Sequence, residues 1–133
     1  MSEAPTDPVS VVRGVYDAFA RGDIPGFFAL LAPDIVWHEA AGHPYGGVYV
    51  GHEAIMQNVL ARIGAEWNDF SAPAEQFIAQ GDTVVTLGAY RGTCKATGNS
   101  LVAPFAIVWT VRDGKVRALH QHTDTELFQA AIR

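Results

Sequence analysis

The sequence predicts an α+β domain with helices on one face of a curved antiparallel sheet. In the first half of the chain, apolar residues recur at helical spacing from Val12 to Phe19. From residue 70 onward, β-rich runs are separated by the hairpin turn signals Gly81-Asp82 and Asp113-Gly114. Helices followed by an antiparallel meander are typical of such domains.

Three helices are expected before the meander. Asp7-Pro8 marks the start of the first, because a capping side chain is followed by Pro at the first helical position, and Gly22 ends it. Asp23 caps a second, short helix. A third helix is expected over residues 52 to 63, closed by Gly64.

The strands follow from β-rich composition and turn signals, and Pro73 indicates a bulge or an edge position. The run 101–112 is apolar on both faces, as in a strand buried on both sides. Strands are expected at residues 35–39, 70–79, 83–95, 101–112 and 115–124, and a short final helix at residues 126–132.

Composition limits the function classes. A chain of 133 residues fits one domain, here residues 1–133 with a loose tail at residues 1–6. The net charge is -5 without a basic stripe, which argues against nucleic acid as a partner. The single Cys94 cannot form an internal disulfide, and no Cys/His pair has zinc-site spacing. No apolar run approaches a membrane span, so we expect a cytoplasmic protein.

The stretch from Asp34 to Gly51 is interpreted as one wall and the rim of a ligand cavity. Alternation along a strand places Trp37 and Glu39 on one face. A carboxylate in an apolar pocket has a raised pKa, which suits proton transfer near neutral pH. Glu39 is therefore a candidate general base; the alternative is a carboxylate in solvent at the strand end.

The loop half of this stretch carries His43, Tyr45 and Tyr49 among glycines. This mixture suggests a possible lid that closes over a ligand, with an ordinary exposed loop as the alternative.

The last strand supplies further candidates. On a regular strand, His120, His122 and Asp124 share a face with Val116, and this row could form a proton relay. Alternatively each imidazole is solvent-facing or satisfied, and Asp124 caps the final helix. A metal site formed by His120, His122 and Glu39 is chemically conceivable.

An apolar wall is expected on the neighbouring strand, where Phe105, Ile107 and Trp109 share a face. Together with Phe19, Phe28 and Trp37 they could line a pocket for a small hydrophobic molecule. Plain core packing is the alternative for each.

Several separated motifs occur in an order that resembles the SnoaL-like group of the nuclear transport factor 2-like superfamily, together with the ketosteroid isomerases. They are Arg21-Gly22-Asp23, Pro33-Asp34-Ile35-Val36-Trp37, Gly51-His52-Glu53-Ala54-Ile55, the run from Val108 to Val116, and Thr123-Asp124-Thr125.

The resemblance implies a cone-shaped domain, with a bent sheet wrapped around the first helix and a central cavity between them. It also implies a homodimer formed through the outer sheet face, and a pocket that works without metal or cofactor. Glu39 falls where ketosteroid isomerases place their catalytic Asp, and Asp124 matches an acidic residue that SnoaL-like proteins often place at this strand end.

The chain also departs from these relatives. Their helix-one tyrosine would match Val15, so Tyr16 is one position off and is rotated by about 100°. No carboxylate lies between Leu101 and Val111 to match the second isomerase acid, and Ile107 stands where many relatives carry a His. The limonene epoxide hydrolase Asp-Arg-Asp trio is not evident.

Two functions are therefore carried forward. One is a cofactor-free acid/base enzyme acting on a small hydrophobic molecule, with Glu39 as base and His122 and Asp124 as acid or oxyanion partner. Tyr16 and His120 complete the expected ligand-binding set. The other is a non-catalytic ligand-binding or dimeric scaffold module of the same fold.

Overall fold

The computed structural model describes residues 7–133, so the expected tail at residues 1–6 lies outside the described residues. The helical segments are α1 (Pro8–Arg21), α2 (Ile24–Ala29), α3 (His52–Ile55), the π-helical turn η1 (Met56–Leu60), α4 (Ala61–Glu66) and α5 (Thr125–Ile132). The strands are β1 (Leu31–Glu39), β2 (Gly47–Val50), β3 (Trp67–Ser71), β4 (Ala74–Gln80), β5 (Thr83–Cys94), β6 (Ser100–Arg112) and β7 (Lys115–Thr123).

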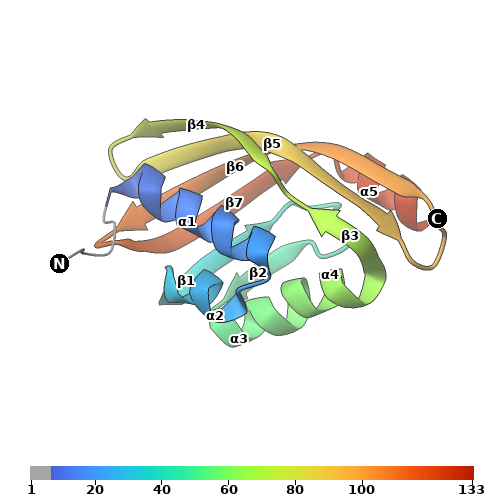
Figure 1. Cartoon of the computed structure of the whole chain (residues 1–133), viewed down its shortest axis with the longest axis horizontal. Helices are drawn as coiled ribbons and strands as arrows, with labels where there is room; N and C mark the ends of the chain where they lie inside the picture. The colour runs from blue at the N-terminus through green and yellow to red at the C-terminus, as the bar shows by residue number, and fades with distance from the viewer. Residues whose placement is uncertain (1–6) are drawn as a thin grey trace.

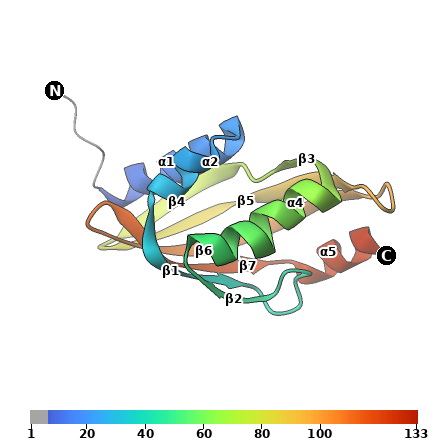
Figure 2. The same cartoon turned by 90° about the horizontal axis from the view of Figure 1, so that it is seen from below.

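The strands form one curved sheet with the order β2-β1-β7-β6-β5-β3, and β4 also pairs with β5. β1 runs parallel to β7, whereas the other described pairs are antiparallel. The helices α1 and α2 and the run from α3 to α4 lie on the same side of the sheet, and α5 lies near one end of it (Figures 1 and 2). This confirms the predicted α+β fold with a bent sheet around helices. None of the described helices is long and apolar enough to cross a membrane.

The predicted helix starts are confirmed. The Asp7 carboxylate accepts a hydrogen bond from the Ser10 N–H at 3.0 Å, and the Asp23 carboxylate accepts one from the Gly26 N–H at 2.9 Å. Gly22 ends α1 with φ 70°, a left-handed conformation that costs glycine little. These local signals set where α1 and α2 stand relative to β1.

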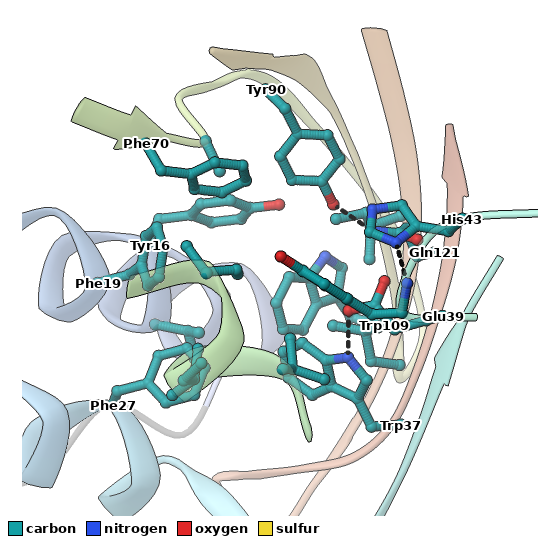
Figure 3. A pocket seen from close by; sticks show the side chains of 18 of the residues that line it. Tyr16, Phe19, Phe27, Trp37, Glu39, His43, Phe70, Tyr90, Trp109 and Gln121 are labelled. Carbon is teal, nitrogen blue, oxygen red and sulfur yellow. Dashed lines mark hydrogen bonds between the residues drawn. The ribbon is translucent and has the colours of Figure 1, made fainter. Parts of the chain in front are cut away.

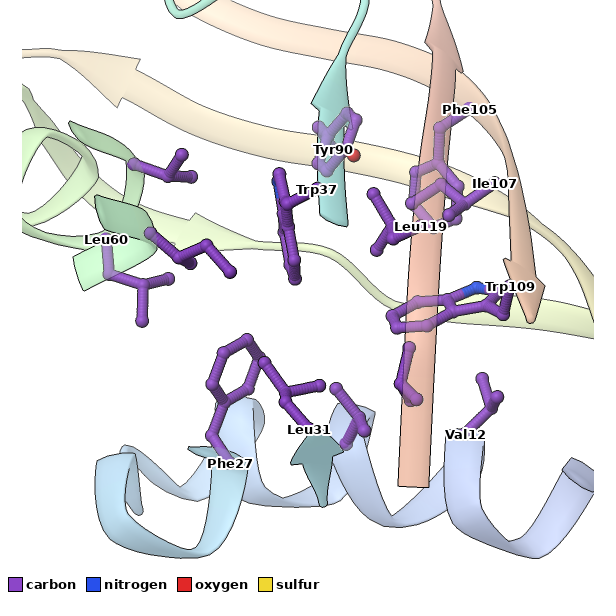
Figure 4. Packing of buried hydrophobic residues seen from close by; sticks show 14 of the residues in the cluster. Val12, Phe27, Leu31, Trp37, Leu60, Tyr90, Phe105, Ile107, Trp109 and Leu119 are labelled. Atoms are coloured by element: carbon purple, nitrogen blue, oxygen red, sulfur yellow. The ribbon is translucent and has the colours of Figure 1, made fainter. Parts of the chain in front are cut away.

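The core lies between the helices and the concave face of the sheet. Val12 of α1 and Phe27 of α2 point toward Trp37 and Trp109 on the sheet (Figure 4). All four side chains are less than 10% exposed. Apolar burial of this kind contributes about 25 cal/mol per Å² and holds the helices against the sheet.

Three boundaries differ from prediction. The third helix runs past Gly64 to Glu66, because Gly64 keeps helical geometry and the chain becomes extended only at Trp67. Pro73 separates β3 from β4, so two strands replace the single one expected. Part of the expected rim loop is the strand β2, which pairs with β1.

The face assignment of the last strand was wrong. Thr110 pairs with Ala118, and the adjacent Val111 pairs with Val116, so Arg117 is an extra residue that forms a β-bulge. The bulge reverses the alternation beyond it. Leu119 and Gln121 face the interior, while His120 and His122 face outward and are exposed.

Candidate active site

A cavity lies between the concave face of the sheet and the helices. Its unfilled space is about 670 Å³ including the open mouth, but only about 70 Å³ admits the centre of a water molecule, so it is a narrow slot. Aromatic and aliphatic side chains form most of its walls. Glu39, His43 and Gln121 lie together on one side, opposite Phe19 and Phe27 (Figure 3).

Glu39 is the buried carboxyl group of this cavity. It stands two residues after Trp37 on β1, and only 7% of it is exposed. Its Oε1 accepts a hydrogen bond from Trp37 Nε1 at 3.1 Å. Its Oε2 is buried and has no partner among the described residues. A buried acceptor without a partner is costly, so Oε2 lacks the hydrogen bond that a buried carboxylate oxygen usually makes.

Burial also changes the acidity of Glu39. Desolvation raises the pKa of this carboxyl to about 7, and the Trp37 hydrogen bond only partly opposes the shift. Near neutral pH both the acid and the carboxylate are therefore populated. A group with this pKa can accept a proton and return it in the same reaction.

Tyr90 and Gln121 form a hydrogen-bonded pair in the same cavity. Gln121 Oε1 accepts a bond from the Ala40 N–H at 3.0 Å, which sets the orientation of the amide. Gln121 Nε2 then donates to Tyr90 Oη at 2.8 Å. Because Tyr90 accepts this bond, its own O–H proton stays available for another acceptor. Burial, followed by the charge of Glu39, raises the pKa of Tyr90 well above its usual value, so the hydroxyl remains a donor.

His43 is a second neutral donor on the cavity wall. Its Nδ1 accepts a hydrogen bond from the Tyr45 N–H at 3.0 Å, so the neutral ring carries its proton on Nε2. Burial, with a smaller effect of the Arg62 charge, lowers the pKa of His43 to about 4. The ring packs on Phe128 with 4.2 Å between centroids. At neutral pH His43 is therefore an uncharged N–H donor.

Tyr16 is held by a separate network. Its Oη lies 2.7 Å from Thr86 Oγ1, which also accepts a hydrogen bond from Trp109 Nε1 at 2.9 Å. Burial raises the pKa of Tyr16 to about 12, against the opposing hydrogen bonds from Thr86 and Trp109. The neutral Tyr16 ring is thus fixed as a wall between the helix and the sheet.

The expected lid is anchored in this structure. Tyr45 Oη donates to Glu66 at 2.8 Å and accepts from Trp67 Nε1 at 3.0 Å. Tyr49 Oη donates to the Tyr45 carbonyl at 2.7 Å. His43 and Tyr45 line the cavity, whereas Tyr49 does not. These bonds hold the segment as a closed wall.

The expected convergence of Glu39 with His122 and Asp124 was wrong. His122 points outward because of the β7 bulge, and its ring stacks on His120 at 4.7 Å. His120 in turn stacks on His38 at 4.9 Å on the outer face. Asp124 is exposed and caps α5, with its carboxylate accepting from the Leu127 N–H at 3.3 Å. The conceivable metal trio of His120, His122 and Glu39 is likewise divided between two faces of the sheet.

Part of the expected ligand-binding set faces one space. Tyr16 and Phe19 of α1, Trp37 of β1, and Ile107 and Trp109 of β6 all line the cavity.

Phe28 and Phe105 were expected in the wall, but neither lines the cavity. Phe105 is buried behind Tyr90, with 4.7 Å between ring centroids. Two polar lining residues, Tyr90 and Gln121, were missed. The apolar residues Val116 and Leu119 could have indicated the bulge in β7. Residues three apart cannot share a face on a regular strand, so two apolar residues at this spacing point to an extra residue between them.

Comparison with known proteins assigns the chain to a family. Residues 12–119 match the SnoaL-like domain family. An uncharacterized protein of Mycobacterium tuberculosis is 28% identical over 117 residues, covering 85% of this chain and 86% of its own length.

Solved structures of similar proteins have the same fold. The crystal structure of an NTF2-like protein from Burkholderia thailandensis is 37% identical, with a TM-score of 0.91 over 95% of this chain and 97% of that one. TerC, co-crystallized with polyporic acid, is 28% identical, with a TM-score of 0.85 over 94% of this chain and 97% of that one. The chain therefore belongs to the SnoaL-like domain family with an NTF2-like fold, a family that includes both enzymes and ligand-binding proteins.

Proposed function

We propose that this protein catalyses cofactor-free proton transfer on a small, planar, hydrophobic molecule, with Glu39 as the acid/base group. One observation carries the proposal: a buried carboxyl with a pKa of about 7 and one unpartnered oxygen lines an aromatic cavity. The co-crystallization of TerC with polyporic acid supports ligand binding by a relative of the same fold.

The reaction class is isomerase or lyase chemistry beside a carbonyl group. The Glu39 carboxylate removes a proton from the carbon next to the carbonyl, and the electron pair moves onto the carbonyl oxygen. Tyr90 O–H and His43 Nε2–H are the donors that stabilise this enolate. The protonated Glu39 then returns its proton to carbon, or a leaving group departs.

Neutral donors suit this role. A preorganised hydrogen bond to developing negative charge accounts for roughly 100- to 1000-fold in rate in well-studied sites. Tyr90 and His43 both stay neutral at pH 7 and keep their N–H or O–H protons. Tyr90 and His43 thus replace His122 and Asp124, which were expected from the sequence as the acid or oxyanion partners of Glu39.

The alternative is a non-catalytic binding module. The narrow aromatic slot and the free Glu39 oxygen also suit a ligand that simply donates a hydrogen bond there. Ligand binding without proton exchange distinguishes this function from catalysis.

Deuterium exchange tests the proposal without a known substrate. We expect the protein to accelerate exchange of the acidic C–H protons of 2-tetralone in D₂O, followed by NMR. Glu39→Gln should fold normally and lower the enzymatic rate by about 100-fold or more. Glu75→Gln, at an exposed position on β4, is the matched control. Binding of 2-tetralone with no exchange above buffer would refute catalysis and favour the binding module.

A further inference from the structure

A second hollow lies on the other side of the cavity wall, between α1 and the connection from β3 to β4. Its unfilled space is about 1100 Å³ including the open side, and about 560 Å³ of it admits the centre of a water molecule. This outer groove is therefore far roomier than the inner slot. Its lining mixes aromatic residues and small residues with two charged groups, Arg13 and Asp17.

The groove and the cavity share a wall. Tyr16, Phe19, Phe70 and Ala72 line both spaces, so the partition is one side chain thick. Tyr16 is held in place through Thr86. Phe19 and Phe70 meet edge to face with 6.5 Å between ring centroids. Ala72 has the smallest side chain of the four wall residues.

Arg13 is the cation of the groove. Its guanidinium carbon stands 4.1 Å from the centre of the Phe77 ring. A guanidinium stacked on an aromatic face keeps its in-plane N–H donors free for a carboxylate. Arg13 is exposed, and no described carboxylate comes within 4.0 Å of it. Five other arginines each form an ion pair within that distance: Arg21, Arg62, Arg112, Arg117 and Arg133.

Asp17 is the second charged group of the groove. It also lines the groove, four residues after Arg13 on α1, which is one helical turn away. It forms no ion pair with Arg13 within 4.0 Å. An anionic group in the groove is attracted by Arg13 and repelled by Asp17.

We infer that one amphiphilic ligand occupies both the cavity and the groove. Its planar apolar ring lies in the cavity beside Glu39, and its carboxylate tail passes Ala72 and pairs with Arg13. The inference rests on the proposed function, because it names the substrate class of the same site. It adds an acidic group to that class and makes Arg13 a specificity residue.

A series of ligands with increasing tail length tests this arrangement. The probes are ω-phenylalkanoates from phenylacetate to 6-phenylhexanoate, together with their primary amides, measured by calorimetry. We expect an affinity gain of tenfold or more for the acid over its amide at the length that reaches Arg13. Arg13→Gln should abolish the gain and leave amide binding unchanged. Arg91→Gln is the control and should preserve the affinity gain, because Arg91 is exposed on β5 and does not line the groove.

A second variant tests whether the groove holds the tail. Ala20→Phe, at an exposed position of α1 that lines the groove but not the cavity, should remove the gain of the long acids while phenylacetate binds as before, with the thermal midpoint reporting that the fold is intact. Equal binding of acids and amides at every length would overturn the inference. That result would leave the 2-tetralone exchange, and with it the proposed function, standing. Charge-dependent binding without exchange would instead remove the catalytic function and retain the groove.

Discussion

Gln121 donates a hydrogen bond to the hydroxyl of Tyr90 over 2.8 Å, and this bond determines where the tyrosine proton can go. The amide cannot rotate without losing its bond from the Ala40 N–H. Tyr90 is therefore an acceptor toward Gln121 and a donor toward the cavity.

Reversing the Gln121 bond should reduce catalysis. In Gln121→Glu, the new carboxylate accepts from both Ala40 N–H and Tyr90 O–H, so Tyr90 no longer donates to the ligand. We expect a fall of about 100-fold in the 2-tetralone exchange rate. The added charge should also move the midpoint of the pH–rate profile upward, because a like charge raises the pKa of Glu39. Gln76→Glu on exposed β4 is the control. An unchanged midpoint would show that Gln121 does not act on the site.

Glu39 should make the protein less stable as the pH rises. Its pKa is raised from 4.5 to about 7 in the folded chain. Between these values the folded state holds a proton that the unfolded state has lost, so the free energy of unfolding falls with increasing pH. The stability contribution is complete below pH 4.5 and is lost by about pH 7, a total of about 3 kcal/mol.

Urea unfolding from pH 4 to 8 measures this effect. The difference in unfolding free energy between Glu39→Gln and the natural protein should grow in favour of the variant over that range. A constant difference would contradict the raised pKa.

His43 should act in the opposite direction. Its pKa is lowered from 6.5 to about 4, so the unfolded chain gains a proton on this ring before the folded chain does. Its contribution is complete above pH 6.5 and is lost as the pH falls toward 4, by about 3 kcal/mol. The effects of Glu39 and His43 therefore nearly cancel between pH 4.5 and 6.5.

Single variants should separate the two effects. The stability of His43→Gln should fall as the pH rises through this window, whereas the stability of Glu39→Gln should rise. Parallel urea titrations of the two variants provide the measurement. The same slope in both would exclude the assigned protonation states.

The outer face of the sheet should form a homodimer. Val48 of β2 pairs with His38, His38 with His120, and His120 with Val108, so these residues form a row across four strands on that face. Val48 is 58% exposed and the nearby Val50 is 60% exposed. We expect light scattering to give twice the chain mass of 14.3 kDa.

Charge on that face should break the dimer. Val50→Lys should yield a monomer, because a buried unpaired lysine is costly. Met56→Lys is the control, since Met56 is exposed on the helical side of the molecule. A monomeric natural protein would contradict the prediction.

The sequence predicted features that depend on neighbouring residues. The cap at Asp7, the left-handed Gly22 and the turn at Asp113-Gly114 are local, and all were placed correctly. Alternation also placed Trp37 and Glu39 together on the inner face of β1.

The features that were missed depend on distant contacts. The Ala40–Gln121 bond joins residues 81 positions apart, and the Gln121–Tyr90 bond joins residues 31 positions apart. No local pattern encodes such pairs. The β7 bulge then exchanged the two faces of the strand, so the acid/base partners were sought among His122 and Asp124.

The extra residue Arg117 has a genetic consequence. Loss of its codon would make Val116 and Ala118 neighbours, so the pairs Val111–Val116 and Thr110–Ala118 would follow one another in a regular ladder. Every side chain beyond the bulge would keep its face, with Leu119 and Gln121 inside and His120 and His122 outside. A second deletion in β7 before Leu119 would find no extra residue to absorb it and would exchange the two faces. The bulge therefore lets this strand lose one residue without a change in the chemistry of the pocket.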